Sequence, residues 1–444
     1  MEYFFCYKIK TIFIKILSFF IIFLSFKCLA NEIEPTKLIS FEKVLPLAFE
    51  NNKILLISVN NHKSSKLSYK ASKSVLYPKL DLTANIAEQD DSNPNSVNEN
   101  FSPREYKIKV TQNLWDFNQS NSTVLMSSLR TKLSEINIVE TKQNIILKAA
   151  RAYSNYRKAR SQFFLSLDFE KKLKNQTGMQ DYRIKQGAAI STDLLQSKNA
   201  LAKAITSRVV SYGNFQRSAI AFQSTFNFTP DLKTDILPIN VPLMILPKNR
   251  ETYIKTVLKS GLMAQKIEIN KKISDILKDN SFASNFLPKF TLTGEINHKD
   301  NYAGTAGFLT ENIVKVEMKW PIELFGTQID KFKSSLLLSD NALTQYLETL
   351  KNITDSSNSK WINFQNEKTN LEFINNQVNI AKEFLKMSDL EFKKGRGNMN
   401  IVISAQNAFY NSQTSLKEAV ANFALTSYSV LSDVNQLTLR NISN

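Results

Sequence analysis

The chain has 444 residues, a formal net charge of +17 and 43% hydrophobic residues, but only ten glycines, two histidines and two cysteines. These counts exclude glycine-rich phosphate loops and clusters of metal ligands, and no nucleophile–base pair or pair of acids indicates an enzyme or a cofactor. The positive charge is spread along the whole chain without a basic tract or a nucleic-acid motif. It therefore indicates a solvated surface and no nucleic-acid partner.

Residues 1–30 are typical of a secretory signal peptide. An apolar stretch over residues 16–26 follows three lysines, and the small-residue segment at 28–30 fits a cleavage site. Both cysteines lie in this segment, and removing its four lysines and one glutamate leaves a charge of +14. Export without disulfides predicts a periplasmic or outer-membrane protein, with an uncleaved N-terminal anchor as the alternative.

The rest of the chain consists of two similar units, about 208 residues apart. The sequence YPKL at 77–80 returns as LPKF at 287–290, and the surroundings of Gly187 return at Gly395. A period this long indicates a duplicated domain-sized unit, not a solenoid repeat. We assign the units to residues 31–228 and 249–436, joined by a proline-rich crossing segment at 229–248 and followed by a tail at 437–444.

In chain order, an amphipathic helix over 41–75 is followed by two strands and a long helical hairpin. The strands are expected at about 80–90 and 105–115, and the hairpin at 118–228 with its tip near Gly187. The second unit repeats the strands at about 289–298 and 312–321, and the hairpin at 326–436 with its tip near Gly395. Both hairpins show the 3.5-residue period of coiled coils, and the glycines allow a positive φ at the tips.

The alternating strands fit a membrane sheet and a soluble sheet over a core equally well. Aromatic residues at the strand ends, such as Trp115 and Trp320, favour a membrane interface. Because a bilayer tolerates no open sheet edge, four strands would require several chains. Two chains give a filled eight-stranded barrel and three give a twelve-stranded barrel with a lumen. The lumen would then be lined by the polar strand residues Lys107, Lys109, Lys315, Glu317 and Lys319.

The order and spacing of these parts resemble the TolC family of outer-membrane factors over almost all of residues 41–436. The resemblance rests on the duplication, the two strand starts, the strand exits at 112–116 and 320–326, and the two glycine-centred tips. It implies a mainly α membrane protein whose unit of two strands plus a coiled-coil hairpin is duplicated. Three such chains would form a homotrimeric 12-stranded β-barrel in the lipid of a Gram-negative outer membrane, continued by a periplasmic α-barrel.

The resemblance also implies the partners and the role. A periplasmic adaptor, or membrane fusion protein, and an inner-membrane transporter of the ABC, RND or a similar type would complete a tripartite efflux pump or a type I secretion system. The chain itself would be a passive exit duct without enzymatic activity. The alternative is a periplasmic coiled-coil adaptor or scaffold without a membrane barrel. The duplication argues against this alternative, because such adaptors usually have one hairpin with a lipoyl-like domain.

In this family the hairpin tips form a gate and dock the adaptor, and the docking positions here are Gly187, Ala188, Gly395 and Gly397. Asp193 occupies the position of an acidic gate-linking residue, whose expected partners lie near Phe392 and Gly397 in the second tip. Neither is the tyrosine or arginine of the family, although Arg396 is adjacent. The family's ring of aspartates falls on Ile401 and Ser404, so an apolar constriction could replace the acidic ring. The alternative for Asp193 is a helix cap.

Overall fold

The computed structural model describes residues 38–50, 52–91, 99–187, 191–232, 234–302 and 307–443. The predicted signal peptide, Ala188 and part of the polar loop after the first strand lie outside the described residues. The chain divides into a small unit, whose described part is Leu38–Ile39 and Pro230–Ile236, and a large unit formed by the rest. In the small unit, β1 (Leu38–Ile39) pairs in parallel with β6 (Asp235–Ile236).

The large unit begins with short helical pieces where the sequence pattern predicts one helix over 41–75. These are α2 (Phe41–Val44), the 3-10 turn η1 (Leu45–Ala48), α3 (Lys53–Ser72) and the 3-10 turn η2 (Lys73–Leu76). Pro46 lies in the first turn of η1, and Asn52 caps α3 by accepting hydrogen bonds from the backbone N–H groups of Ile54 and Leu55 at 3.1 Å. A capping asparagine starts a new helix, which explains why the stretch over 41–75 is divided at Asn52.

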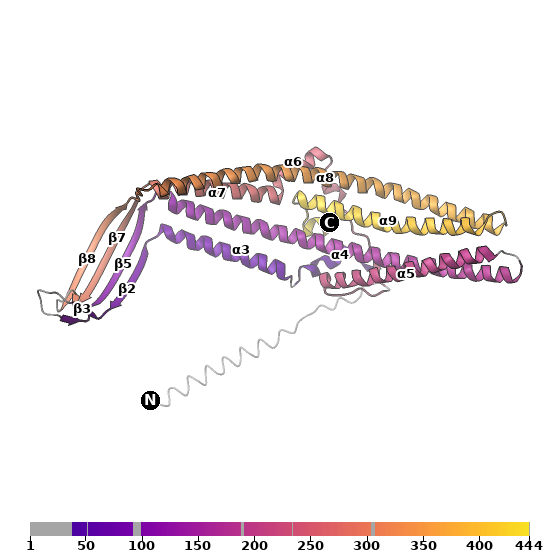
Figure 1. The fold of residues 1–444 in the computed structure, drawn as a ribbon, viewed down its shortest axis with the longest axis horizontal. Helices are drawn as coiled ribbons and strands as arrows, with labels where there is room; N and C mark the ends of the chain where they lie inside the picture. The colour runs from indigo at the N-terminus through magenta and orange to yellow at the C-terminus, as the bar shows by residue number, and fades with distance from the viewer. Residues whose placement is uncertain are drawn as a thin grey trace, which may run out of the picture. The chain divides into compact units, whose positions relative to one another are not determined.

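Four strands of the large unit form one antiparallel sheet in the order β2-β5-β7-β8. They are β2 (Lys79–Ile86), β5 (Arg104–Trp115), β7 (Lys289–Asp300) and β8 (Phe308–Lys319). Each half of the chain supplies one hairpin, and the two hairpins join where β5 pairs with β7. A small separate ladder, β3 (Gln89–Asp91) with β4 (Glu99–Phe101), follows β2. The sheet is open, with β2 and β8 at its edges (Figure 1).

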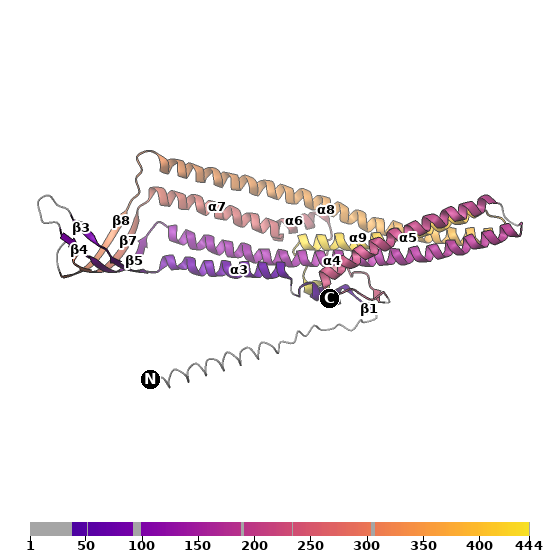
Figure 2. The ribbon, with the colours of Figure 1, turned by 60° about the horizontal axis from the view of Figure 1, so that its bottom comes forward.

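Two long helical hairpins account for most of the large unit. The first consists of α4 (Gln119–Lys185) and α5 (Ser191–Phe226), and the second of α8 (Thr327–Lys393) and α9 (Met399–Asp433). α4 and α8 each have 67 residues, which corresponds to about 100 Å. The two hairpins lie side by side, with α4 against α9 (Figure 2). The prediction of a mainly helical chain with two hairpins is confirmed.

Shorter helices pack along the halves of α4 and α8 that lie nearer the sheet. α3 lies along α4, and α7 (Leu262–Phe286) lies along α8. α6 (Arg250–Ser260) precedes α7, and α10 (Leu439–Ser443) ends the described chain. The two halves of the chain therefore repeat the same succession of helix, two strands and hairpin. None of the described helices combines the length and the apolar composition needed to cross a bilayer.

The main core lies where α2 and residues 237–240 at the end of the crossing segment meet α4 and the last turns of α9. Phe41 contacts Tyr153 and Tyr428, with ring centroids 5.4 and 5.9 Å apart. The Tyr153 hydroxyl donates to the carbonyl of Leu237 at 2.8 Å, and the Tyr428 hydroxyl donates to the carbonyl of Asn240 at 3.1 Å. Buried phenols with satisfied hydroxyls therefore hold Leu237 and Asn240 against the helices of the large unit.

A second buried cluster lies in the second half of the chain. Tyr253 of α6 stacks on Trp361 of α8, and the cluster also contains Val257, Phe364, Val430 and Val434. Tyr153 and Trp361 occupy corresponding positions in the two units, and both are buried.

Candidate functional site

The two faces of the four-stranded sheet differ in chemistry and in exposure. Val314 and Val316 on the apolar face are 83% and 64% exposed, while Thr293 and Asn297 on the polar face are 3% and 4% exposed. A soluble antiparallel sheet over a core shows the opposite arrangement, with apolar side chains buried and polar side chains exposed. None of the described helices covers a face of the sheet, because the helices leave it at one end (Figure 1).

The strand register places all five predicted lining residues on the polar face. Lys107 faces Asn297, Lys109 faces Glu295, Lys315 faces Thr293 and Glu317 faces Thr291. Lys319 continues the row along β8. Since residues alternate between the faces of a strand, these five side chains and their partners share one surface.

Acidic residues that the sequence analysis does not single out accompany these lysines. Lys109 pairs with Glu295 at 3.3 Å, and Lys107 pairs with Glu105 at 3.4 Å. Three further ion pairs lie on this face: Lys79–Asp81 at 2.6 Å, Lys299–Glu311 at 2.7 Å and Lys315–Glu317 at 3.4 Å. The polar face therefore carries both positive and negative side chains, and lysines outnumber the acidic residues.

Backbone geometry at the hairpin tips explains two of the predicted glycines. Gly187 has φ +69° and Gly395 has φ +72°, a region that strains residues with a side chain. Gly397 has an ordinary φ, but a Cβ there would lie 3.2 Å from the backbone nitrogen of Phe392. Tight space thus favours glycine at position 397, whereas backbone conformation favours it at the other two positions.

The four predicted gate residues lie on both tips. Asp193 is half-buried in the first turn of α5, and Arg396 is exposed in the turn between α8 and α9. No ion pair joins these two side chains within the described part of one chain. Ile401 and Ser404 are exposed on the first turns of α9, whereas their neighbours Val402 and Ala405 are buried. Ile401 and Ser404 therefore face away from the core of their own hairpin.

Contacts between the two tips involve Phe392, near which a partner of Asp193 is expected, and three residues that the sequence does not single out. The Arg183 guanidinium of α4 lies over the Phe392 ring of α8, 5.2 Å from its centroid. The Gln176 amide of α4 donates to the sulfur of Met399, the first residue of α9, at 2.6 Å. These contacts join the ends of the two hairpins to each other.

Between the tips and the core, aromatic stacking joins the hairpins. Phe169 of α4 stacks on Tyr410 of α9 with centroids 4.6 Å apart. The Tyr410 hydroxyl lies 3.2 Å from the hydroxyl of Ser207 on α5. Tyr410 thus bridges the two helices of the first hairpin to the second hairpin.

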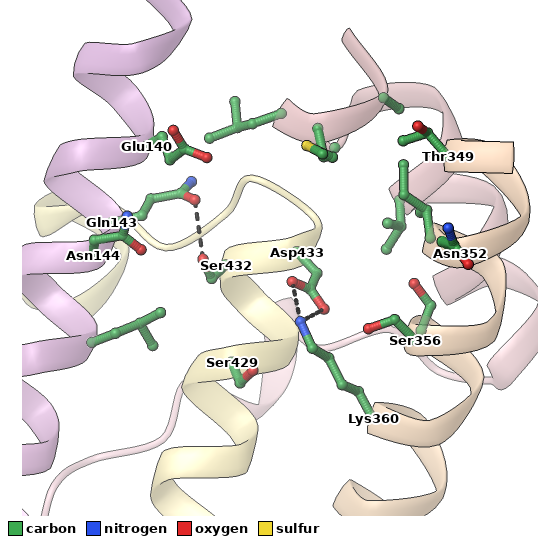
Figure 3. A pocket seen from close by; sticks show the side chains of 18 residues that line it. Glu140, Gln143, Asn144, Thr349, Asn352, Ser356, Lys360, Ser429, Ser432 and Asp433 are labelled. Carbon is green, nitrogen blue, oxygen red and sulfur yellow. Dashed lines mark hydrogen bonds and ion pairs between the residues drawn. The ribbon is translucent and has the colours of Figure 1, made fainter. Parts of the chain in front are cut away.

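A cavity of about 490 Å³ lies where α9 ends and α7 begins, between α4 and α8. Figure 3 shows Lys360 of α8 reaching Asp433, with its ammonium 2.8 Å from both carboxylate oxygens. On the opposite wall, the Ser432 hydroxyl donates to the side-chain oxygen of Gln143 at 3.1 Å. Polar contacts from both long helices therefore fix the end of α9. No sequence motif marks this cavity.

No family model and no curated protein matches the sequence. Solved structures do match. A membrane protein from Pseudomonas aeruginosa is 14% identical, with a TM-score of 0.78 over 89% of this chain and 93% of that chain. The outer membrane protein VceC from Vibrio cholerae is 14% identical, with a TM-score of 0.74 over 91% of this chain and 96% of that chain.

The open state of the Neisseria gonorrhoeae MtrE outer membrane channel is 16% identical to this chain. Its TM-score is 0.73 over 90% of this chain and 89% of that chain. Likeness at this level of identity establishes a shared fold across nearly the whole length of both proteins. The chain has the fold of the TolC-family outer-membrane channels.

Proposed function

We propose that the protein is the outer-membrane exit duct of a tripartite efflux pump or a type I secretion system. The observation that carries the proposal is the sheet, which exposes Val314 and Val316 on one face and carries a lysine-rich charged surface on the other. A bilayer favours this arrangement, with the apolar face toward lipid and the polar face toward water. The shared fold with outer-membrane channels supports the same role.

The duct is a homotrimer. One chain supplies four strands in an open sheet, and an open edge in a bilayer leaves backbone groups unpaired at a cost of several kcal/mol each. Three copies supply twelve strands, enough for a barrel with an aqueous lumen. The hairpins then continue the lumen into the periplasm. Their 67-residue helices, about 100 Å long, give the tube its length.

The gate lies at the hairpin tips. Ile401 and Ser404 face away from their own hairpin, and such side chains would narrow a lumen enclosed by three copies. Asp193 and Arg396 lie on different hairpins and carry opposite charge, so an ion pair between the tips would hold the gate closed. The glycine tips at Gly187, Gly395 and Gly397 dock a periplasmic adaptor, and an inner-membrane transporter supplies the energy.

Detergent extraction, native mass determination and single-channel recording in a planar bilayer test this function together. The expected result is a trimer with a small conductance, since the gate is closed without its adaptor. A water-soluble monomer without conductance would contradict the duct and favour the periplasmic adaptor or scaffold.

A further inference from the structure

Charge is balanced over most of the polar face of the sheet. Among the described residues, five lysines of this face each lie within 3.4 Å of an acidic residue of the same face. The pairs are Lys79–Asp81, Lys107–Glu105, Lys109–Glu295, Lys299–Glu311 and Lys315–Glu317. Together these side chains carry no net charge.

Two further lysines of this face lie directly opposite each other, Lys289 on β7 and Lys319 on β8. Lys289 is the first residue of its strand and Lys319 is the last, so both lie at the end of the sheet from which the helices leave (Figure 1). Neither lysine takes part in an ion pair within the described part of the chain. The Cβ atoms of such a pair are about 5 Å apart. Each chain therefore carries two uncompensated positive charges side by side at this end.

The segments that connect the strands to the helices contain two acidic residues, and both are engaged elsewhere. Glu323 pairs with Lys331 at 3.5 Å. The buried Asp116 accepts hydrogen bonds from the Asn113 amide and from the backbone N–H of Ser120. Its carboxylate thus lies at the first turn of α4, where the helix dipole stabilises a negative charge. Neither acid supplies a counter-charge to the two opposed lysines.

Two opposed lysines cost the sheet stability and supply a site for an anion. Like charges directly opposite each other destabilise a strand pair, and sequences break such local rules mainly at functional sites. Lys319 is exposed and Lys289 is half-buried, so both long side chains can bring their ammonium groups to water. Two neighbouring ammonium groups without a counter-charge attract a carboxylate or a phosphate. The pair is therefore suited to an anionic solute.

We propose that Lys289 and Lys319 of three copies form a ring that selects anions, and that the cargo of the duct is anionic. The proposal rests on the proposed function, in which the polar face lines the lumen, and it names the chemical class of the cargo. Three copies bring six uncompensated lysines to the level where the helical tube opens into the barrel. A neighbouring copy adds Lys79 and Asp81 on its edge strand, and this pair carries no net charge. Rings of lysine or arginine side chains make pores selective for anions.

The reach of this ring depends on the salt concentration. A fixed charge acts over about 10 Å at an ionic strength of about 0.1 M, and over about 3 Å at about 1 M. Anions should therefore be favoured in dilute salt and lose this advantage in concentrated salt. Ile401 and Ser404, at the proposed constriction, carry no charge. They would impose no preference of their own on small ions.

Reversal potentials of the full-length protein in a planar bilayer test the ring. A gradient of KCl across the bilayer compares the permeability of chloride with that of potassium. We expect the unmodified channel to favour chloride by roughly threefold near about 0.1 M salt, and to lose most of this preference near about 1 M. Native mass and unfolding temperature in detergent are measured on the same preparations.

Two double variants change the charge of the ring. Lys289→Gln with Lys319→Gln removes both charges, and the ratio of chloride to potassium permeability should fall close to one. Lys289→Glu with Lys319→Glu reverses both charges and should make the channel favour potassium. The glutamine variant removes a repulsion between strands, so its unfolding temperature should not fall. The matched control, Lys299→Gln with Glu311→Gln, removes one ion pair of the same face without changing its net charge and should keep the preference for chloride.

The results separate the ring from the duct. A conducting trimer without a preference for chloride would overturn the ring and leave the duct standing. The same holds if the preference survives Lys289→Glu with Lys319→Glu, because the selectivity would then arise elsewhere. An equal loss of preference in the control would also overturn the ring, since the net charge there is unchanged. A monomer without conductance would refute the proposed function, and the ring with it.

Discussion

The hydroxyl of Tyr253 donates a hydrogen bond of 2.7 Å to the carboxylate of Asp433 at the end of α9. The same carboxylate accepts the ammonium of Lys360 at 2.8 Å. One acidic side chain thus ties α6, α8 and α9 together beside the cavity shown in Figure 3.

Replacing this carboxylate should destabilise the protein more than removing one donor. Asp433→Ala removes the acceptor of both the Tyr253 hydroxyl and the Lys360 ammonium, and we expect a loss of about 2–3 kcal/mol. Tyr253→Phe keeps the Lys360–Asp433 ion pair and should cost about 1 kcal/mol. Thermal unfolding in detergent measures both variants, and equal shifts would contradict the central role of Asp433.

The buried phenols predict a loss of stability at alkaline pH. Burial raises the pKa of Tyr153, Tyr253 and Tyr428 above the ordinary value. An unfolded chain releases these protons near pH 10, whereas the folded protein retains them. Below about pH 10 the buried phenols therefore contribute fully to the free energy of unfolding. Above this pH that free energy falls by up to about 1.4 kcal/mol per pH unit for each phenol.

Unfolding temperatures measured from about pH 8 to 11, with absorbance of the phenolate, test this slope. The double variant Tyr153→Phe and Tyr428→Phe should show a shallower alkaline decline than the unmodified protein. If the unfolding temperature of the double variant declines with pH as steeply as that of the unmodified protein, these two hydroxyls do not cause the decline.

The two faces of β8 predict opposite tolerance of a charge. Val316→Arg puts a guanidinium on the apolar face, where arginine near the middle of a bilayer costs about 2–4 kcal/mol. We expect little of this variant in the urea-resistant outer-membrane fraction. The matched control is Glu317→Arg, which adds the same side chain one residue away on the polar face. Equal loss from both variants would argue against lipid on the Val316 face.

A disulfide between the tips tests the gate. Asp193→Cys combined with Arg396→Cys should form a link on oxidation that blocks export and single-channel conductance, and a reductant should restore both. The single variants serve as controls, because neither can form the link. Unimpeded export by the fully linked protein would refute the proposed contact.

Ion selectivity tests whether Ile401 lines the constriction. Ile401→Asp in three copies places a ring of carboxylates there, and cation preference of the reconstituted channel should rise. Ile401→Asn is the matched control, since it adds polarity without charge. It should increase conductance and leave selectivity unchanged. If the ion selectivity of Ile401→Asp equals that of the unmodified protein, Ile401 does not line the lumen.

Local patterns in the sequence predict the elements well because they depend on near neighbours. The alternation in residues 105–115 predicts the strand β5, and the single glycines Gly187 and Gly395 predict tips with positive φ, which the structure has. The stretch over 41–75 is the exception, since Pro46 and the helix-capping Asn52 interrupt a continuous apolar pattern.

Contacts between distant segments could not be predicted in the same way. Lys109 faces Glu295 only because β5 and β7 adopt one particular register, and no local signal fixes that register. The contact of Arg183 with Phe392 and the pairing of Lys360 with Asp433 depend on how two long hairpins are aligned. The sequence therefore indicates which lysines share a strand face, but not which acids balance them.

The joining of β5 to β7 also determines the order in which the protein can be assembled. The first half of the chain emerges with a two-stranded ribbon and a hairpin whose partners belong to the second half. Gln143 of α4, for example, meets Asn435 only 292 residues later. Contacts this distant in sequence form slowly and leave apolar strands exposed in the meantime. If the chain is exported as proposed, it should therefore depend on periplasmic chaperones until its last helix arrives.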